Sequence, residues 1–327
     1  MELINETGIP ARLSTGALDD RQNAAWCVAR ATWRIAADGR LDALDDAPWP
    51  ILDAPLRTAY GGFPSDAHVE ERGCGLVVTG EARFARAVTE GAVRVRVGDF
   101  SRALALVGDR AWTRVGRDWE PSAPRPFRAM RTDWSRAYGG VTRDGAHPFN
   151  PEGRGFVTDE DLVAGCALPN LEDPEDPIRR WDQRVRPAGF GPVPDAGDRC
   201  VEAWCASQRA AGRAVSLAGV ARAREGAWRG AAAPENVAPS VRAGAPIAVA
   251  LGERMWAGEA PRDEFVLEVR RDAQRSELAL AMTGLWLFLD EGLCVATWRA
   301  AFRYPLVGGE LRAATLRRRG AGGRSWA

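Results

Sequence analysis

The plainest pattern in the chain is a strict alternation of apolar and charged residues over Val93–Val97. Valine occupies the first, third and fifth positions, and Arg94 and Arg96 stand between them. Because successive side chains of a strand point to opposite faces, this pattern predicts a strand with its valines inward and its arginines in solvent. A Gly-Asp pair then supplies a turn, and the apolar run Ala103–Val107 should return as the partner strand.

Similar runs at both ends of the chain predict further strands. Their β-branched, aromatic and leucine-rich composition fits a half-buried pleated surface better than a helix. The predicted strands are Trp26–Ile35, Leu76–Gly80, Ile247–Leu251, Phe265–Arg270, Leu278–Met282, Leu285–Leu289 and Cys294–Phe302. Asp290–Gly292 separates the last two as a hairpin turn. Many short strands with turn signals between them are typical of an antiparallel β-sandwich or a barrel-like sheet, so the predicted fold class is mainly β.

The middle of the chain, residues 121–194, follows neither the helix period nor the strand period. Glycine, proline and asparagine are dense there, and each of them dictates a local turn. Long irregular segments of this kind are usually either functional or disordered. Aromatic side chains argue for order, because they bury enough apolar surface to offset the entropy of ordering. They are Phe127, Trp134, Tyr138, Phe149, Phe156 and Phe190. We therefore expect an ordered loop layer packed on a sheet.

The whole pattern predicts a single domain over residues 1–315. Its parts are a β-rich region at 20–120, the central loop layer at 121–194, a variable and partly helical insert at 195–235, and a second β-rich region at 245–305. The insert carries only a fragmentary helical stripe, which indicates one or two short helices. Residues 316–327 are rich in glycine and arginine and are expected to form a flexible tail. Within the loop layer, Tyr138–Gly140 should form a tight turn of special geometry above a buried aromatic ring.

Charge does not favour a nucleic-acid or membrane partner. The chain has 44 acidic and 44 basic residues, and every basic one is arginine. It therefore lacks the net field that would attract nucleic acid or an anionic membrane. We attribute the arginine bias to the base composition of the genome rather than to an arginine-rich binding face. No apolar run reaches the length of a membrane span, and the N-terminus lacks the layout of a signal peptide, so we expect a cytoplasmic protein.

The sequence offers few groups for catalysis or metal binding. The two histidines, His68 and His147, lie far apart, and the six cysteines show no spacing typical of a zinc site. A P-loop in its usual form needs a lysine that the chain lacks, and no Gly-x-Ser-x-Gly elbow is present. Acidic clusters at 159–161 and 172–176 are more simply solvated loops than a glycosidase pair. We therefore predict no catalytic residue, no metal and no cofactor.

Four motifs in the loop layer together carry a family resemblance. They are Ala137-Tyr138-Gly139-Gly140, Asn150-Pro151-x-Gly153-x-Gly155-Phe156, Leu168-Pro169-Asn170-Leu171-Glu172 and Gly189-Phe190-Gly191-Pro192. In this order and spacing they resemble the family named domain of unknown function 2169. Flanking matches extend the likeness over most of the chain: Phe63-Pro64-Ser65-Asp66, Gly108-Asp109-Arg110-x-Trp112 and Trp298-Arg299. The chain departs from the family pattern at Glu71, at Gly75 and after Pro192.

The resemblance implies a function without catalysis. Members of that family are found in bacterial type VI secretion gene clusters, where they are thought to place an effector on the VgrG/PAAR spike. We therefore expect a cytosolic adaptor or chaperone whose partner is a secreted effector, a PAAR/VgrG spike protein, or both. Two alternatives stay open. One is a hydrolase that acts on carbohydrate or peptidoglycan through acidic loop residues, Glu172 above all. The other is a degenerate structural relative that has lost its partner.

The resemblance, together with the aromatic and glycine content of the loops, also indicates where a partner would bind. Glycines allow close approach of a partner's backbone, and interfaces take most of their energy from aromatic and arginine anchors. A purely structural alternative has Phe156 in the core and Arg154 paired with Glu172. The residues expected to bind the partner are Tyr138, Gly139, Gly140, Asn150, Arg154, Phe156, Asn170 and Glu172.

Overall fold

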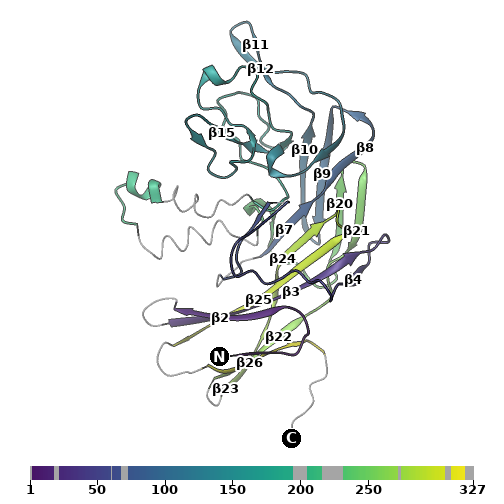
Figure 1. The fold of residues 1–327 in the computed structure, drawn as a ribbon, viewed down its shortest axis with the longest axis vertical. Helices are drawn as coiled ribbons and strands as arrows, with labels where there is room; N and C mark the ends of the chain where they lie inside the picture. The colour runs from purple at the N-terminus through teal and green to yellow at the C-terminus, as the bar shows by residue number, and fades with distance from the viewer. Residues whose placement is uncertain are drawn as a thin grey trace.

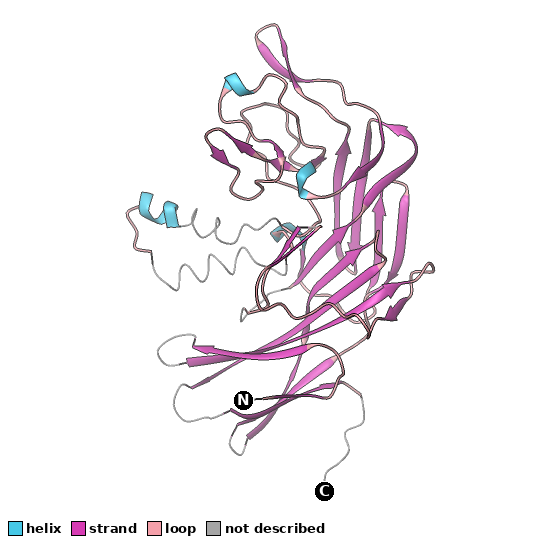
Figure 2. Cartoon of the chain, in the orientation of Figure 1, coloured by secondary structure: helices cyan, strands magenta, loops and turns pink. Residues whose placement is uncertain are grey.

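The computed structural model describes residues 2–17, 22–59, 61–67, 73–193, 205–215, 231–271, 274–305 and 311–320. Strands dominate this part of the chain, with a few short turns of helix between them (Figure 2), which confirms the mainly β prediction. Three larger sheets follow one another along the long axis of the molecule. The irregular central segment lies at one end of this axis and the smallest of the three sheets at the other (Figure 1).

The middle sheet has seven strands, two of them long. Its strands are β2 (Ala11–Ala17), β3 (Gln22–Ile35), β4 (Leu41–Ala43), β7 (Cys74–Thr79), β19 (Val237–Ala238), β24 (Ala281–Phe288) and β25 (Leu293–Pro305). The order is β19-β7-β24-β25-β3-β2, with β4 beside β3. β7 runs parallel to β24, and the other pairs are antiparallel. The predicted turn at residues 290–292 joins β24 to β25.

A five-stranded sheet carries the alternation that the sequence predicts. Its strands are β9 (Glu90–Val97), β10 (Phe100–Val107), β18 (Leu171–Glu172), β20 (Pro246–Leu251) and β21 (Arg254–Glu259). They pair antiparallel in the order β18-β10-β9-β20-β21. Val93, Val95 and Val97 are buried while Arg94 and Arg96 are exposed, as expected. Because β18 belongs to the central segment, its pairing with β10 attaches that segment to the sheet.

A four-stranded sheet contains β26, a strand that the sequence patterns do not predict. Its strands are β1 (Leu3–Asn5), β22 (Phe265–Arg271), β23 (Gln274–Ala279) and β26 (Leu311–Arg318), in the order β1-β26-β22-β23. A flexible tail that begins at residue 316 is therefore wrong, since Leu316 is fully buried and the strand continues to Arg318. Burial alternates along β26, with Ala314 and Leu316 buried, but the residues themselves do not alternate between apolar and charged, and three of the eight are arginine. Residues 321–327 lie outside the described part of the chain.

The three sheets share one hydrophobic core. It collects the inward side chains of β9, β10 and β20, of β22 and β26, and of one face of β3, β7, β24 and β25. The opposite face of the seven-stranded sheet is covered by a second cluster of packed aromatic rings. That cluster includes Trp49, Phe63, Trp286 and Phe288. The middle sheet is thus buried on both faces, as in a sandwich with an added covering layer.

A buried ionic cluster fastens this covering layer to the sheet. The Oδ1 atom of Asp66 accepts hydrogen bonds from Nη2 of Arg30 at 2.8 Å and Nη2 of Arg299 at 2.6 Å. Its Oδ2 atom accepts one from the backbone N–H of Leu52 at 2.7 Å. All three charged side chains are buried. Two of the flanking motifs, Phe63–Asp66 and Trp298–Arg299, therefore meet in the interior, where they hold the fold together.

The loop layer is ordered around a core of its own, as predicted. Its short elements are β13 (Phe127–Arg131), η1 (Trp134–Arg136), β14 (Tyr138–Gly139), β15 (Val141–Thr142), β16 (Gly145–Ala146), β17 (Arg154–Gly155) and η2 (Glu160–Leu162). The hairpin of β11 (Trp112–Val115) and β12 (Asp118–Pro121) packs on it through Trp112. Buried residues at its centre are Tyr138, Val157, Val163, Leu168, Ile178 and Val185.

Several sequence expectations meet a different outcome elsewhere. The predicted strand Leu278–Met282 is wrong, because the chain crosses at Leu280 from the four-stranded sheet to the seven-stranded one. Further strands that the patterns do not predict are β5 (Leu56–Thr58), β6 (Gly61–Phe63) and β8 (Glu81–Val88). The insert predicted at 195–235 falls largely outside the described residues. Its described part holds a helix at 205–210 and the short turn η3 (Pro234–Asn236).

Candidate functional site

The segment Tyr138–Gly140 has a backbone that glycine alone adopts readily. Gly139 and Gly140 have φ values of 147° and 117°, and the ring of Tyr138 is buried, so the prediction of special geometry is confirmed. The segment is nevertheless a strand, β14, paired parallel with β17, rather than a tight turn. A Cβ atom on Gly139 would lie 2.1 Å from the backbone oxygen of Asn150. Glycine is needed here because two loops of the same layer touch.

Asn150 is the residue that these two loops share. Its Nδ2 donates to the carbonyl oxygens of Trp134 and Tyr138, both at 2.9 Å. Its backbone oxygen accepts from the N–H of Gly140 at 2.8 Å. The side chain is fully buried. Buried amides of this kind are retained for the hydrogen bonds they make, so Asn150 braces the loop layer from within.

His147 fixes the other end of the same loop. Its Nδ1 accepts hydrogen bonds from the backbone N–H groups of Phe149 at 3.3 Å and Asn150 at 3.2 Å, which requires an unprotonated Nδ1. The ring packs edge-on against Phe156. Burial first, and then the charge of Arg184, lower the pKa of His147 to about 4. The imidazole is therefore neutral at neutral pH and serves as a hydrogen-bond acceptor.

Asn170 joins the loop layer to the end of β10. Its Nδ2 donates to the carbonyl oxygen of Val107 at 2.9 Å and to Oδ1 of Asp109 at 3.0 Å. Its Oδ1 accepts from Nη1 of Arg136 at 3.1 Å. The side chain is fully buried, so Asn170 aligns the exposed Asp109 and the partly exposed Arg136 from below.

Glu172 is a buried partner of Arg110. One oxygen of its carboxylate accepts a hydrogen bond from Nη2 of Arg110, which also donates to the carbonyl oxygen of Pro169 at 3.1 Å. Glu172 is 7% exposed and Arg110 is 12% exposed. Burial raises the pKa of Glu172, and the charge and hydrogen bond of Arg110 oppose that rise. This ion pair closes the contact between β18 and the flanking motif Gly108–Trp112.

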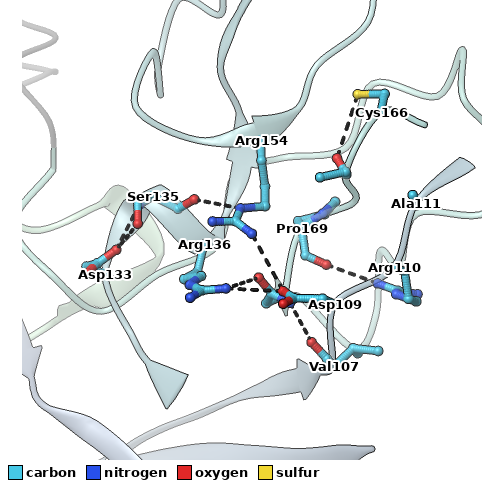
Figure 3. Close-up of polar contacts among 12 residues, drawn as sticks. Val107, Asp109, Arg110, Ala111, Asp133, Ser135, Arg136, Arg154, Cys166 and Pro169 are labelled. Atoms are coloured by element: carbon cyan, nitrogen blue, oxygen red, sulfur yellow. Dashed lines mark hydrogen bonds and ion pairs between the residues drawn. The ribbon is translucent and has the colours of Figure 1, made fainter. Parts of the chain in front are cut away.

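Arg154 does not pair with Glu172. Its Nε donates to the carbonyl oxygen of Ser135 at 3.0 Å, and its Nη1 lies 3.7 Å from Oδ1 of Asp109. The same oxygen of Asp109 lies 3.2 Å from Nη1 of Arg136 (Figure 3). Asp109 is 60% exposed, whereas Arg136 and Arg154 are 31% and 29% exposed. Charged groups of both signs therefore meet at the surface of the loop layer.

The last motif, Gly189–Pro192, attaches the loop layer to the seven-stranded sheet. The carbonyl oxygen of Phe190 accepts from the N–H of Val78 in β7 at 2.8 Å. The carbonyl oxygen of Gly191 accepts from Nε1 of Trp134 at 2.8 Å. That of Gly189 accepts from Nδ2 of Asn236 at 2.7 Å. Three separate parts of the chain are thus joined by backbone groups of this motif.

The predicted site residues divide into buried and partly exposed ones. Arg154 and Phe156 are partly exposed, and Phe156 packs against the loop-layer core. The remaining predicted residues are buried braces within the layer: Tyr138, Gly139, Gly140, Asn150, Asn170 and Glu172. Sequence reasoning missed Asp109, Arg136 and the 55%-exposed Phe149. Asp109 could have been found from the sequence, since it lies in the flanking motif Gly108–Trp112 beside the mostly buried Arg110.

The described residues offer no metal site. Within them no group of three or more histidine, cysteine, aspartate or glutamate side chains could hold an ion. In the same part of the chain, no helix has both the length and the apolar character needed to cross a membrane.

Comparison with known proteins identifies one family. The model of a family described as an uncharacterized protein conserved in bacteria (DUF2169) matches residues 20–299, which is most of the chain. No curated protein and no solved structure matches. The matched region contains all four loop-layer motifs and reaches Arg299 of the buried ionic cluster.

Proposed function

The chain belongs to the DUF2169 family, and from this premise we propose that it is a non-enzymatic protein-binding module. Its role is that of a cytosolic adaptor or chaperone that binds a type VI secretion effector and helps to load it on the VgrG/PAAR spike. The connection to secretion rests on the family resemblance of the loop-layer motifs. The binding role also has support from the way in which the loop layer is built.

The observation that carries the proposal is the inward use of the motif side chains. Asn150 and Asn170 direct their side-chain N–H donors, and Glu172 directs a carboxylate oxygen, to neighbouring parts of the chain. Loops held in this way present a fixed surface. Because the loops are already ordered, they lose less conformational entropy when a partner binds. What the layer turns outward includes an exposed aromatic ring, Phe149, and arginine side chains. These are the residue types that anchor protein–protein interfaces.

A hydrolase that uses Glu172 is less well supported. A glycosidase needs two carboxylates on opposite sides of a bond in an accessible cleft. Glu172 is 7% exposed, and one of its oxygens is bound to Arg110. Such a carboxylate cannot approach a polysaccharide unless the ion pair opens and the loop moves.

The proposal is tested by capture of the partner from the bacterial host. Tagged protein should co-purify with an effector or a VgrG/PAAR spike protein, identified by mass spectrometry. The variants Arg154→Ala, Phe156→Ala and Glu172→Ala should weaken this capture more than Arg94→Ala combined with Arg96→Ala. The matched control removes two exposed arginines from β9, which pair with Ala103 and Ser101 and not with the end of β10 that β18 contacts at Ala105 and Leu106. Substitutions at such solvated positions usually change stability by less than about 0.5 kcal/mol.

Melting temperatures measured on the same variants separate binding from folding. Phe149→Ala is the cleanest surface probe, because its side chain is mostly exposed. Loss of capture by a variant that melts like the unmodified protein supports the proposal. Loss that only follows the fraction of folded protein means that the loop layer is a scaffold. If the protein hydrolyses peptidoglycan or another glycan, and Glu172→Gln abolishes this activity, the protein is a hydrolase and the adaptor proposal is wrong.

A further inference from the structure

An arginine pair, Arg136 and Arg154, lies at the surface of the loop layer and is incompletely matched by negative charge. Both guanidinium groups approach the same Oδ1 atom of Asp109, at 3.2 Å and 3.7 Å (Figure 3). The nearby Asp133 pairs through its Oδ2 with Nε of Arg131 at 2.7 Å, so its charge acts on Arg154 without forming an ion pair with it. One carboxylate therefore serves two guanidinium groups.

Most hydrogen-bond donors of the arginine pair remain available. A guanidinium group carries five N–H donors. Arg136 uses Nη1 for Asp109 and Asn170, while Arg154 uses Nε for Ser135. Within the described residues, Nε and Nη2 of Arg136 and Nη2 of Arg154 donate to no protein atom. Since both side chains are about a third exposed, these donors can meet a ligand.

The backbone holds the two arginines in place before any ligand arrives. The N–H of Arg154 donates to the carbonyl oxygen of Ala137 at 3.0 Å, and the N–H of Asn170 donates to that of Arg136 at 2.7 Å. The buried side chain of Asn170 then fixes the guanidinium of Arg136. Loss of side-chain entropy usually opposes binding by long charged residues. Because these two side chains are already held, binding a ligand here loses little of it.

We propose that the arginine pair binds a carboxylate side chain in an acidic segment of the protein partner. This inference rests on the proposed binding function and names the chemistry that the partner must offer. Guanidinium groups recognise carboxylates through two parallel hydrogen bonds, and the free donors of the pair suit that geometry. Burial first, and then the charge of Arg136, lower the pKa of Arg154, and the charges of Asp109 and Asp133 offset only part of this. A bound carboxylate relieves this repulsion, which adds to the attraction.

The test uses purified full-length protein and a short fluorescein-labelled, C-terminally amidated peptide that alternates glutamate with serine. Fluorescence anisotropy is measured at about 0.15 M salt, where distant surface charges are screened. The glutamine counterpart of the peptide and inorganic phosphate as a competitor identify the chemistry. The variants are Arg136→Gln with Arg154→Gln, and Asp109→Asn. Arg94→Gln with Arg96→Gln removes the same charge from β9 as a matched control.

Arg136→Gln with Arg154→Gln should weaken peptide binding at least about tenfold, because charge-assisted hydrogen bonds are lost. The control should stay within about twofold, and Asp109→Asn should bind more tightly, because the competing carboxylate is gone. Equal losses in the control and the paired variant overturn it, as does equal binding of the glutamine peptide or preferred binding of phosphate. If the paired variant fails to fold, Asp109→Asn still tests the proposal, because binding that is not tighter in this variant contradicts it. If a partner is captured from the host equally well by all these variants, this inference is wrong, whereas the proposed adaptor function still holds.

Discussion

Replacing Gly139 with alanine should destabilise the protein by about 3–5 kcal/mol. The residue has a φ of 147°, and L side chains adopt such a backbone at a cost of about 1–3 kcal/mol. The new Cβ would also lie 2.1 Å from the backbone oxygen of Asn150, so that loop must move. Its displacement weakens the bonds from Asn150 to Trp134 and Tyr138, each with a net contribution of about 1 kcal/mol.

Gly145 provides a matched control for this prediction. Its φ is 145°, nearly the same as that of Gly139, but a Cβ built on it meets nothing within 4 Å. Gly145→Ala therefore carries the backbone strain without the collision. Urea unfolding followed by tryptophan fluorescence should place Gly139→Ala about 2 kcal/mol or more below Gly145→Ala. Equal losses in the two variants would refute the idea that contact with Asn150 is what requires glycine.

Three further predictions concern buried titratable groups. As the pH falls from 6.5 to about 4, the free energy of unfolding should drop by up to about 3 kcal/mol, because His147 binds a proton in the unfolded chain but not in the folded one. In His147→Gln, thermal unfolding should show a correspondingly smaller dependence on pH. Arg110→Met should cost about 3–5 kcal/mol by leaving Glu172 buried without its cation, and adding Glu172→Leu should recover most of the loss in chemical denaturation. Asp66→Ala should cost a similar amount, about 3–5 kcal/mol, since it removes the carboxylate that Arg299 binds; a change below about 1 kcal/mol in thermal unfolding would contradict this.

Alternation explains why parts of the fold could be predicted from the sequence. β9 alternates valine with arginine, one face of it is buried, and the period alone settles its orientation. β26 shows no such alternation in its sequence, because Ala313 and Thr315 stand between the buried Ala314 and Leu316 and are weak markers of a solvent face. Its burial is decided by pairing with β22 and β1, partners far away in the sequence. Contacts of this range leave no trace in a local pattern.

The candidate site was predictable as a region but not by the role of its residues. Motif density in the loop layer marks Asn150, Asn170 and Glu172 as important, and the structure shows them used as internal braces. Arg154 is partly exposed, and its carboxylate partner is Asp109, not Glu172. Nothing in sequence spacing distinguishes these two carboxylates, because the choice depends on how β10 and β17 are placed in space.

The position of β26 means that the four-stranded sheet cannot form fully until residues 311–318 have been synthesised. β26 lies between β1 and β22, so β1 has no partner in this sheet until residues 311–318 have left the ribosome. A chain that stops short of β26 would leave β22 with an unpaired edge, Leu267 without its cross-strand neighbour Leu316, and Phe265 without Arg318. Unpaired edges of this kind invite aggregation and proteolysis. Chains that lack β26 therefore differ in fold from chains that contain it, before any partner is bound.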